Sequence, residues 1–289
     1  MLNLLQFEFR RLFRKTSFYV CLAIIGLLVL YAIGIVAQQY SYTERYLSST
    51  PVNPQITTIL FYTMRFANLS VMAGVFSALY ICEDRVKGTI KTIYSLGYSR
   101  VHVFFAKYLA SAFAVTLMYA LMILLSLIGG ILLHADFSSQ YTQSSSILYN
   151  DESTKQISIL VIIIQQYFSI MALHSFYYMI SEFFGNTGPA IVLNIFSPLL
   201  IYIAFMMIIS AYTSFMQNFG DKKIITEATG AIVQVFTMYW LPTMITFFVD
   251  LAGGFANMDY GISIAVNICY IILFGALALL ITQKKQVKN

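Results

Sequence analysis

Charged side chains that could take part in chemistry gather in one stretch of this sequence, residues 83–107. The stretch contains Glu83, Asp84, Arg85, Lys87, Lys91, Arg100 and Lys107. It is the most densely charged segment of a very apolar chain, and apolar runs long enough to cross a bilayer flank it on both sides. Gly88 can end a helix in the left-handed conformation, and Thr89 is then predicted to be the N-cap of a short helix. Gly97 is predicted to end that helix after about two turns, and Ser99 to cap the next one.

The predicted short helix carries one apolar face. Ile90, Ile93 and Tyr94 follow the i, i+3, i+4 spacing that brings side chains to the same side of a helix. Lys91 lies off that face. A helix of about two turns is not stable by itself in water, so neighbouring structure must order it. We therefore expect the face to dock onto another protein at the membrane surface.

A second set of polar residues lies inside otherwise apolar stretches, namely Arg65, Gln165, Gln166 and His174. Arg65 can meet an anionic group of a substrate or a buried acid. Alternatively, it can lie at the outer end of its helix and extend to the interface. Gln165, Gln166 and His174 share a helix face only approximately. They either line a conduit or form hydrogen bonds between helices, which is the commoner role of such residues.

The sequence lacks three common motifs of nucleotide-binding and catalytic sites. It has no Gly-x-x-x-x-Gly-Lys-Ser/Thr loop for ATP, no His-Glu-x-x-His zinc motif and no Gly-x-Ser-x-Gly nucleophile motif. Its three histidines are far apart in the chain, and its three cysteines follow no metal-binding spacing. We expect no catalytic residue, cofactor site or metal site in this chain.

The composition indicates an integral membrane protein. Hydrophobic residues make up 59% of the 289 residues and charged residues only 10%, whereas a soluble domain carries about 25% charged residues. The net charge of +5 does not indicate nucleic-acid binding, because the basic residues flank apolar runs rather than cover a polar face.

The apolar runs predict an all-α protein that forms a single transmembrane domain over residues 1–289. Leu2, Leu5, Phe9 and Leu12 repeat at helical spacing, so residues 1–16 are expected to form an amphipathic elbow helix in the interface. Residues 84–98 form a cytoplasmic loop. Six spans, each close to the length that crosses a bilayer, are expected at about 17–37, 60–82, 108–133, 157–181, 189–212 and 261–282. The polar segment 134–156 is expected to be a loop.

Residues 228–250 are apolar but contain Pro242 and the Tyr239-Trp240 pair near the middle. With six spans and a cytoplasmic N-terminus, twelve of the seventeen lysines and arginines lie on the cytoplasmic side. A seventh span would move the C-terminal lysines outside, which the positive-inside rule disfavours. We therefore expect a re-entrant or surface-lying hairpin at 228–250, with both termini of the chain in the cytoplasm.

The stretch around Gly88 resembles the first cytoplasmic loop of ABC-2 type transporter permeases. The resemblance consists of an acid at the end of a membrane helix, Gly-Thr-Ile-Lys four residues later, then Ser-Arg and a lysine. The matching residues are Asp84 (or Glu83), Gly88, Thr89, Ile90, Lys91, Ser99, Arg100 and Lys107. The family often has a proline before the Ser-Arg pair, where this chain has Gly97-Tyr98. Six spans, an N-terminal elbow helix and re-entrant helices before the last span also resemble the family.

The resemblance implies the permease subunit of an ATP-driven exporter in a bacterial plasma membrane, of the peptide or antibiotic-export or immunity type. Two ATPase subunits would bind ATP and Mg²⁺, and a second copy or a sister permease would complete the assembly. The residues implied in ATPase coupling are Asp84, Gly88, Thr89, Ile90, Ile93, Tyr94, Arg100 and Glu182. The expected substrate is an amphipathic peptide, a lipid-like molecule or a drug.

The main alternative is a secondary transporter or channel driven by an ion gradient. Such proteins usually carry acids within their spans as ion sites. The predicted spans of this chain have uncharged centres, which favours the exporter.

Overall fold

A computed structural model of the chain describes residues 2–46, 54, 56, 59–60, 62–63, 69–135, 140–142, 156–216 and 260–284. The expected hairpin at 228–250 and Arg65 lie outside the described residues. The elements, in chain order, are α1 (Leu2–Leu12), α2 (Thr16–Tyr46), α4 (Leu69–Val86), α5 (Thr89–Ser95), α6 (Arg100–Leu132), β1 (Gln140–Thr142), β2 (Gln156–Ser158), α7 (Ile159–Phe184), α8 (Thr187–Met216) and α11 (Tyr260–Lys284). Apart from short turns and one short ladder, the described residues are helical, which confirms the expected predominance of helices.

Three segments are long and apolar enough to cross a membrane. Within the described residues they are Thr16–Ser41 of α2, Arg100–Leu132 of α6 and Gly261–Lys284 of α11. An apolar helix of about 20 residues spans the hydrocarbon core of a bilayer. This chain is therefore a membrane protein.

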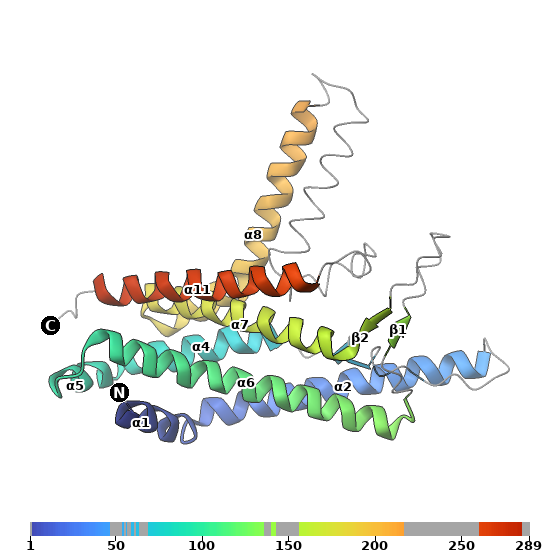
Figure 1. The fold of residues 1–289 in the computed structure, drawn as a ribbon, viewed down its shortest axis with the longest axis horizontal. Helices are drawn as coiled ribbons and strands as arrows, with labels where there is room; N and C mark the ends of the chain where they lie inside the picture. Colours follow the sequence, from blue (N-terminus) through green and yellow to red (C-terminus); the bar gives the residue numbers. More distant parts are fainter. Residues whose placement is uncertain are drawn as a thin grey trace.

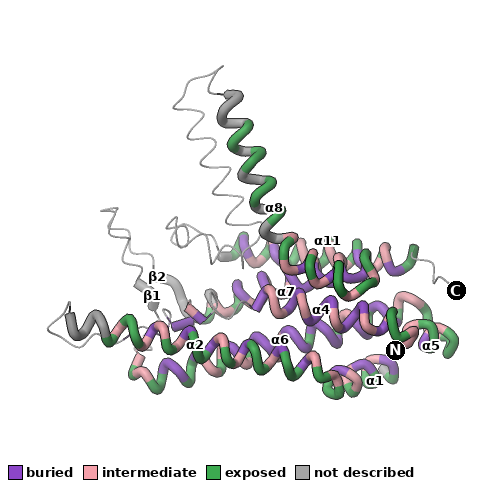
Figure 2. Tube along the Cα trace, turned by 180° about the vertical axis from the view of Figure 1, so that it is seen from behind, coloured by how far each residue is buried: buried purple, intermediate pink, exposed green. Residues whose placement is uncertain are grey.

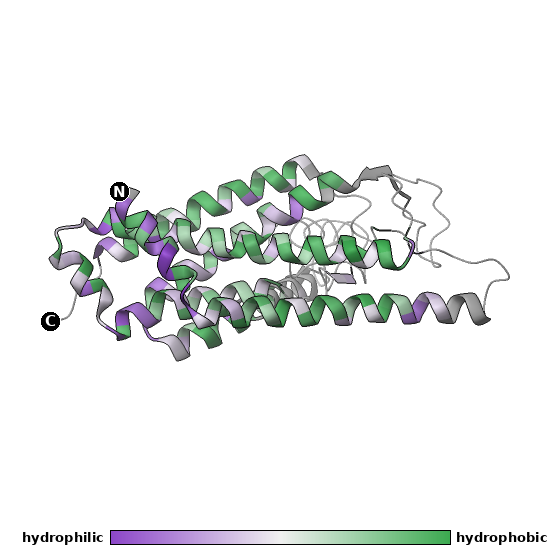
Figure 3. Ribbon diagram, turned by 90° about the horizontal axis from the view of Figure 1, so that it is seen from below, coloured by the Kyte–Doolittle hydropathy of each residue, from purple (hydrophilic) through white to green (hydrophobic). Residues whose placement is uncertain are grey.

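The long helices α2, α4, α6, α7 and α11 run along a common direction, while α8 leaves the bundle at an angle (Figure 1). α1, α5 and the turn between α7 and α8 lie at one end, and β1 and β2 lie at the other (Figure 1). Hydrophilic residues gather at the end with α1 and α5, and hydrophobic residues cover the middle of the bundle (Figure 3). We call the end that carries α1, α5 and the α7–α8 turn the charged end.

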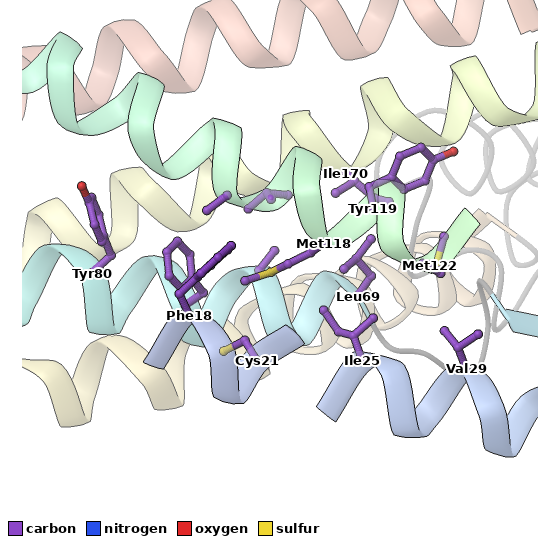
Figure 4. Close-up of a cluster of buried hydrophobic side chains, with 14 of the residues drawn as sticks. Phe18, Cys21, Ile25, Val29, Leu69, Tyr80, Met118, Tyr119, Met122 and Ile170 are labelled. Carbon is purple, nitrogen blue, oxygen red and sulfur yellow. The ribbon is translucent and has the colours of Figure 1, made fainter. Parts of the chain in front are cut away.

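The core lies between the inward faces of α2, α4, α6 and α7, where buried residues concentrate (Figure 2). On α2, buried side chains recur one helical turn apart at Phe18, Cys21, Ile25 and Val29 (Figure 4). Met118 and Met122 of α6 belong to the same cluster. Because lipid tails are themselves apolar, such contacts stabilise the bundle by close packing rather than by removal from water.

Two features differ from the expected secondary structure. The segment 134–156, expected to be a loop, contains β1, which pairs antiparallel with β2 so that Gln140 lies opposite Ser158. Tyr and Thr in β1 and Ile in β2 favour strands, and the pairing satisfies backbone groups between two helices. In addition, α6 begins at Arg100 rather than near residue 108, because Ser99 caps it. The Ser99 hydroxyl accepts from the backbone N–H of His102 at 3.3 Å, as predicted.

Gly129 lets α6 approach α2 closely. A Cβ atom at Gly129 would lie 2.5 Å from Cδ1, 3.0 Å from Cγ1 and 3.1 Å from Cγ2 of Ile33. We predict that Gly129→Ala lowers stability by about 1–3 kcal/mol, because the added methyl overpacks this interface. Thermal unfolding in detergent measures the effect.

The matched control is Gly34→Ala on α2, where an added Cβ meets nothing within 4 Å. Ile33→Ala makes room beside residue 129 and should restore most of the stability lost in Gly129→Ala. Equal stability of the two glycine variants would contradict the close α2–α6 contact.

Candidate functional site at the charged end

Two glycines shape the connection between α4 and α6. Gly88 (φ 72°) and Gly97 (φ 84°) both adopt the left-handed conformation that favours glycine, so α4 and α5 end where the sequence predicted. The prediction that Thr89 caps α5 is wrong, since Thr89 is the first helical residue and Gly88 occupies the cap position. The Gly88 carbonyl accepts a hydrogen bond from the backbone N–H of Lys91 at 2.9 Å, which starts the first turn of α5. No side chain caps the helix.

The predicted apolar face of α5 is divided between two surroundings. Ile93 is buried against Leu4 of α1 and against Val103 and Ala106 of α6. It is therefore covered by this chain itself and is not available to a partner, contrary to the expectation of one exposed face. Tyr94 is half-buried and packs against the same cluster, whereas Ile90 is half-buried outside it.

Asp84, near the end of α4, is the centre of a buried ion cluster. Its carboxylate accepts hydrogen bonds from Arg11 of α1 and Lys107 of α6. Lys15, between α1 and α2, lies 3.3 Å away through its Nζ atom. Only 3% of Asp84 is exposed. One acid therefore joins cations from three separate parts of the chain.

Glu8 of α1 completes the ion cluster, which we define as Glu8, Arg11, Lys15, Asp84 and Lys107. Fully buried, Glu8 lies 3.3 Å from Arg11 and 3.6 Å from Lys107. It also accepts a hydrogen bond of 2.8 Å from the hydroxyl of Tyr80, whose ring centroid lies 4.7 Å from Nζ of Lys15. The ring thus contributes a cation–π contact beside the ion pairs.

Opposing effects set the protonation of the cluster. Burial would raise the pKa of Asp84, but the nearby Lys107, Lys15 and Arg11 outweigh burial and hold this pKa below its ordinary value. Likewise, burial would lower the pKa of Arg11, but Glu8 and Asp84 outweigh it and raise this pKa. The carboxylate and the guanidinium are both kept charged, as mutual ion pairing requires.

Sequence reasoning missed Glu8, and it placed Lys107 without finding its partners. A helical signal for Glu8 exists, because Leu4, Glu8 and Leu12 recur at intervals of four and are all buried. An acid in the buried stripe of a helix requires a cation from elsewhere in the chain. The sequence does not show which cation that is.

A second ion pair joins α4 to the end of α7. Arg85 pairs with the buried carboxylate of Glu182, and its Nη1 atom donates to the backbone carbonyl of the same residue at 2.8 Å. Arg100, at the start of α6, donates to the carbonyl of Gln283 at 2.6 Å and so reaches the end of α11. Asp84, Gly88, Arg100 and Glu182 therefore all lie at the charged end.

A cleft of about 600 Å³ opens between α5 and the α7–α8 turn. The ends of α6 and α11 complete its walls. Its lining includes charged, aromatic and apolar side chains, among them Arg85, Ile90, Lys91, Tyr94, Lys107, Glu182 and Phe184. The cleft thus lies between the two connections at this end, namely the α4–α6 connection that contains α5 and the α7–α8 turn.

The other polar residues from the sequence lie deep between helices. His174 is fully buried on α7, with Nδ1 3.0 Å from the hydroxyl of Ser77 on α4 and Nε2 3.1 Å from that of Ser111 on α6. Gln165 donates to Ser263 of α11 at 3.2 Å. These contacts fit hydrogen bonding between helices. Gln166 is also buried on α7. Among the described residues, no group of three or more His, Cys, Asp or Glu side chains is placed to hold a metal ion.

A family model described as "ABC-2 family transporter protein" matches residues 4–197 of the chain. The matched range includes the ion cluster, α5, the Arg85–Glu182 pair and the α7–α8 turn. A comparison with curated proteins found no match.

Replacing the central carboxylate tests the ion cluster. We predict that Asp84→Asn, which keeps the shape of the side chain, destabilises the protein by about 3–5 kcal/mol, because buried cations lose their partner. The control is Lys87→Ala, which removes an ion pair with Glu83 in which the lysine side chain is 67% exposed. That change should cost less than about 1 kcal/mol. Thermal unfolding in detergent compares the two.

Acid titration provides a second readout of the same variant. Because the pKa of Asp84 is lowered in the folded state, its stabilisation is fully present above its ordinary pKa of about 3.9 and is lost as the pH falls through the folded pKa. Wild type should therefore lose stability below about pH 4, and Asp84→Asn should lose less over the same range. Identical acid profiles would contradict an ionised Asp84.

Proposed function

This chain belongs to the ABC-2 transporter family, and we propose that it is the membrane-spanning permease of an ATP-driven exporter in a bacterial plasma membrane. Permeases of this family are the membrane subunits of ABC transporters, and ATP hydrolysis takes place in a separate subunit. The proposed assembly contains a second copy of this chain or a sister permease, together with two ATPase subunits that bind ATP and Mg²⁺. The proposed substrate is an amphipathic peptide, a lipid-like molecule or a drug.

The observation that carries the proposal is the way α5 is attached. Short turns at Gly88 and Gly97 connect it to α4 and α6, and Ile93 fixes it to α1. The ion cluster then ties α1, α4 and α6 together next to these turns. A displacement of α5 by an ATPase would therefore move three helices together instead of bending a loose connection.

We assign the ATPase contact to the side of α5 that faces away from the protein. Thr92, Ser95 and Leu96 are exposed there, and Leu96 is 70% exposed. Thr89 flanks this surface, whereas Ile90 and Tyr94 lie on the other side of α5 and line the cleft. Phe183, which is 63% exposed beside Glu182, supplies the second and smaller contact. In this proposal, five of the predicted coupling residues position the α4–α6 connection and the α7–α8 turn without touching the ATPase. They are Asp84, Gly88, Ile93, Arg100 and Glu182.

We further propose that α2, α4, α6, α7, α8 and α11 are six spans and that α1 is the elbow helix in the interface. The charged end would face the cytoplasm, with both termini on that side. The basic residues of α1 and α5 support this orientation, since cytoplasmic segments carry an excess of lysine and arginine. Exposed Phe7 and Phe13 of α1 suit contact with the headgroup boundary.

An ion-gradient-driven transporter or channel fits the described residues less well. The buried acids Glu8, Asp84 and Glu182 all lie at the charged end and are paired with cations. The three segments of membrane length contain no Asp or Glu. Acids within spans are the usual ion sites of such transporters.

A charge on the outer side of α5 tests the ATPase contact. We predict that Leu96→Asp leaves the permease folded and inserted, because this side chain is exposed, yet weakens ATPase binding by roughly 100-fold or more. Burying an unpaired carboxylate costs several kcal/mol, and 1.4 kcal/mol corresponds to a factor of about ten in affinity. Co-purification and ATP-driven transport are the measurements.

Two variants serve as comparisons for Leu96→Asp. Leu132→Asp places the same change on a side chain that is 73% exposed at the opposite end of α6, so ATPase binding should stay normal. Ile93→Asp places a carboxylate among Leu4, Val103 and Ala106 and should destabilise the permease itself. Wild-type binding and transport by Leu96→Asp would remove α5 as the docking element.

Labelling tests the proposed orientation. In a background without Cys21, Cys82 and Cys269, Ser95→Cys should react with an impermeant thiol reagent only after the cells are permeabilised. Gln140→Cys, at the β1–β2 end, should react in intact cells. The reversed pattern would place the charged end outside and contradict an ATPase contact there.

A further inference from the structure

We propose that the cleft at the charged end binds the headgroup of an anionic phospholipid. The first support for this is its position. Val103 and Phe104 near the start of α6, and Thr282 near the end of α11, line the cleft. Both helices contain a segment of membrane length, and the cleft lies at the terminal part of each. Lipid headgroups occupy this level, where membrane helices end.

The second support is the charge of the lining. Arg85, Lys91 and Lys107 contribute three cations, whereas Glu182 is the only acid among the described residues that line the cleft. Arg85 pairs with Glu182, and Lys107 is held by Asp84. Lys91 is exposed, and within the described part of the chain it forms no ion pair. Basic pockets between membrane helices are recognised by anionic lipid headgroups.

The size and the apolar walls of the cleft favour a lipid over a smaller anion. A volume of about 600 Å³ lies within the range of about 300–1,000 Å³ that is typical of small-molecule sites. It exceeds what a phosphate ion or one acidic side chain would fill. Ile90 of α5 and Phe184 at the end of α7 add apolar side chains to the lining. An ammonium group beside apolar walls suits a phosphate that carries a glycerol and the start of its acyl chains.

The proposed lipid site does not depend on the ATPase contact. Ile90, Lys91 and Tyr94 line the cleft, whereas Thr92, Ser95 and Leu96 form the outer side of α5 assigned to the ATPase. A lipid in the cleft would contact α5 and the α7–α8 turn together, since both contribute to the lining. The lipid composition of the membrane would thus influence the positions of α5 and of the α7–α8 turn.

Tryptophan fluorescence provides a direct test, because the chain has a single tryptophan, Trp240. In the full chain carrying Trp240→Phe and Phe184→Trp, the new indole reports on the cleft. We expect its fluorescence to change in a saturable way on titration with dihexanoyl phosphatidylglycerol in non-ionic detergent, which gives an affinity for this lipid. Dihexanoyl phosphatidylcholine and inorganic phosphate should give at most a tenth of that affinity. Lys91→Glu should weaken phosphatidylglycerol binding at least tenfold.

The control for this charge reversal is Arg14→Glu, an exposed cation outside the cleft lining, which should leave the titration unchanged. Native mass spectrometry of the unmodified chain, incubated with equal amounts of both lipids, should retain phosphatidylglycerol preferentially and lose this preference in Lys91→Glu. This measurement decides the question if the indole itself occupies the cleft.

Three results would overturn the lipid site. Equal binding of both lipids would indicate contact without headgroup recognition, and equal binding of inorganic phosphate would indicate a simple anion site. Loss of ATPase co-purification in Lys91→Glu, with phosphatidylglycerol binding unchanged, would assign the cleft to the protein partner. Because lipid binding is measured without the ATPase, its failure is distinguishable from failure of the proposed export function.

Discussion

The buried carboxylate of Asp84 is the contact on which the charged end of the bundle depends. It is surrounded by Arg11 of α1, Lys15 of the α1–α2 turn and Lys107 of α6. Removing charges from water is costly, and the cost is recovered only when every member keeps its partners. The cluster therefore allows one arrangement of α1, α4 and α6, and it disfavours arrangements in which a single helix moves away.

This constraint explains how a helix as short as α5 can have a defined position. Its two glycine turns determine where it begins and ends, but they leave its orientation open. Ile93 closes against α1 and α6, and the ion cluster holds these two helices together beneath it. The Arg85–Glu182 pair then links the same end of α4 to the α7–α8 turn. The connections at this end are consequently joined through buried charges.

Local features were predictable from the sequence, and contacts distant in the chain were not. Gly88, Gly97 and Ser99 act through their own backbone or through the next turn, so their positions could be inferred from residue type. The pairing of Glu8 with Lys107 joins residues far apart in sequence, and helical spacing alone cannot identify it. The same spacing grouped Ile90, Ile93 and Tyr94, but it could not show that the rest of the chain covers Ile93. Among apolar side chains, burial by protein and exposure to lipid leave the same pattern in the sequence.

The central claim is that α1 and α5 move as one unit, because Ile93 packs against α1 and the ion cluster ties α1 to α4 and α6. Pulsed electron paramagnetic resonance between spin labels at Gln6→Cys and Lys91→Cys, both exposed positions, tests it most directly, in the assembled transporter without its native cysteines. The account predicts one narrow distance distribution that stays the same with and without ATP, and a broader one when Asp84→Asn is added. A distance between α1 and α5 that changes on ATP addition in the protein with Asp84 intact would contradict it.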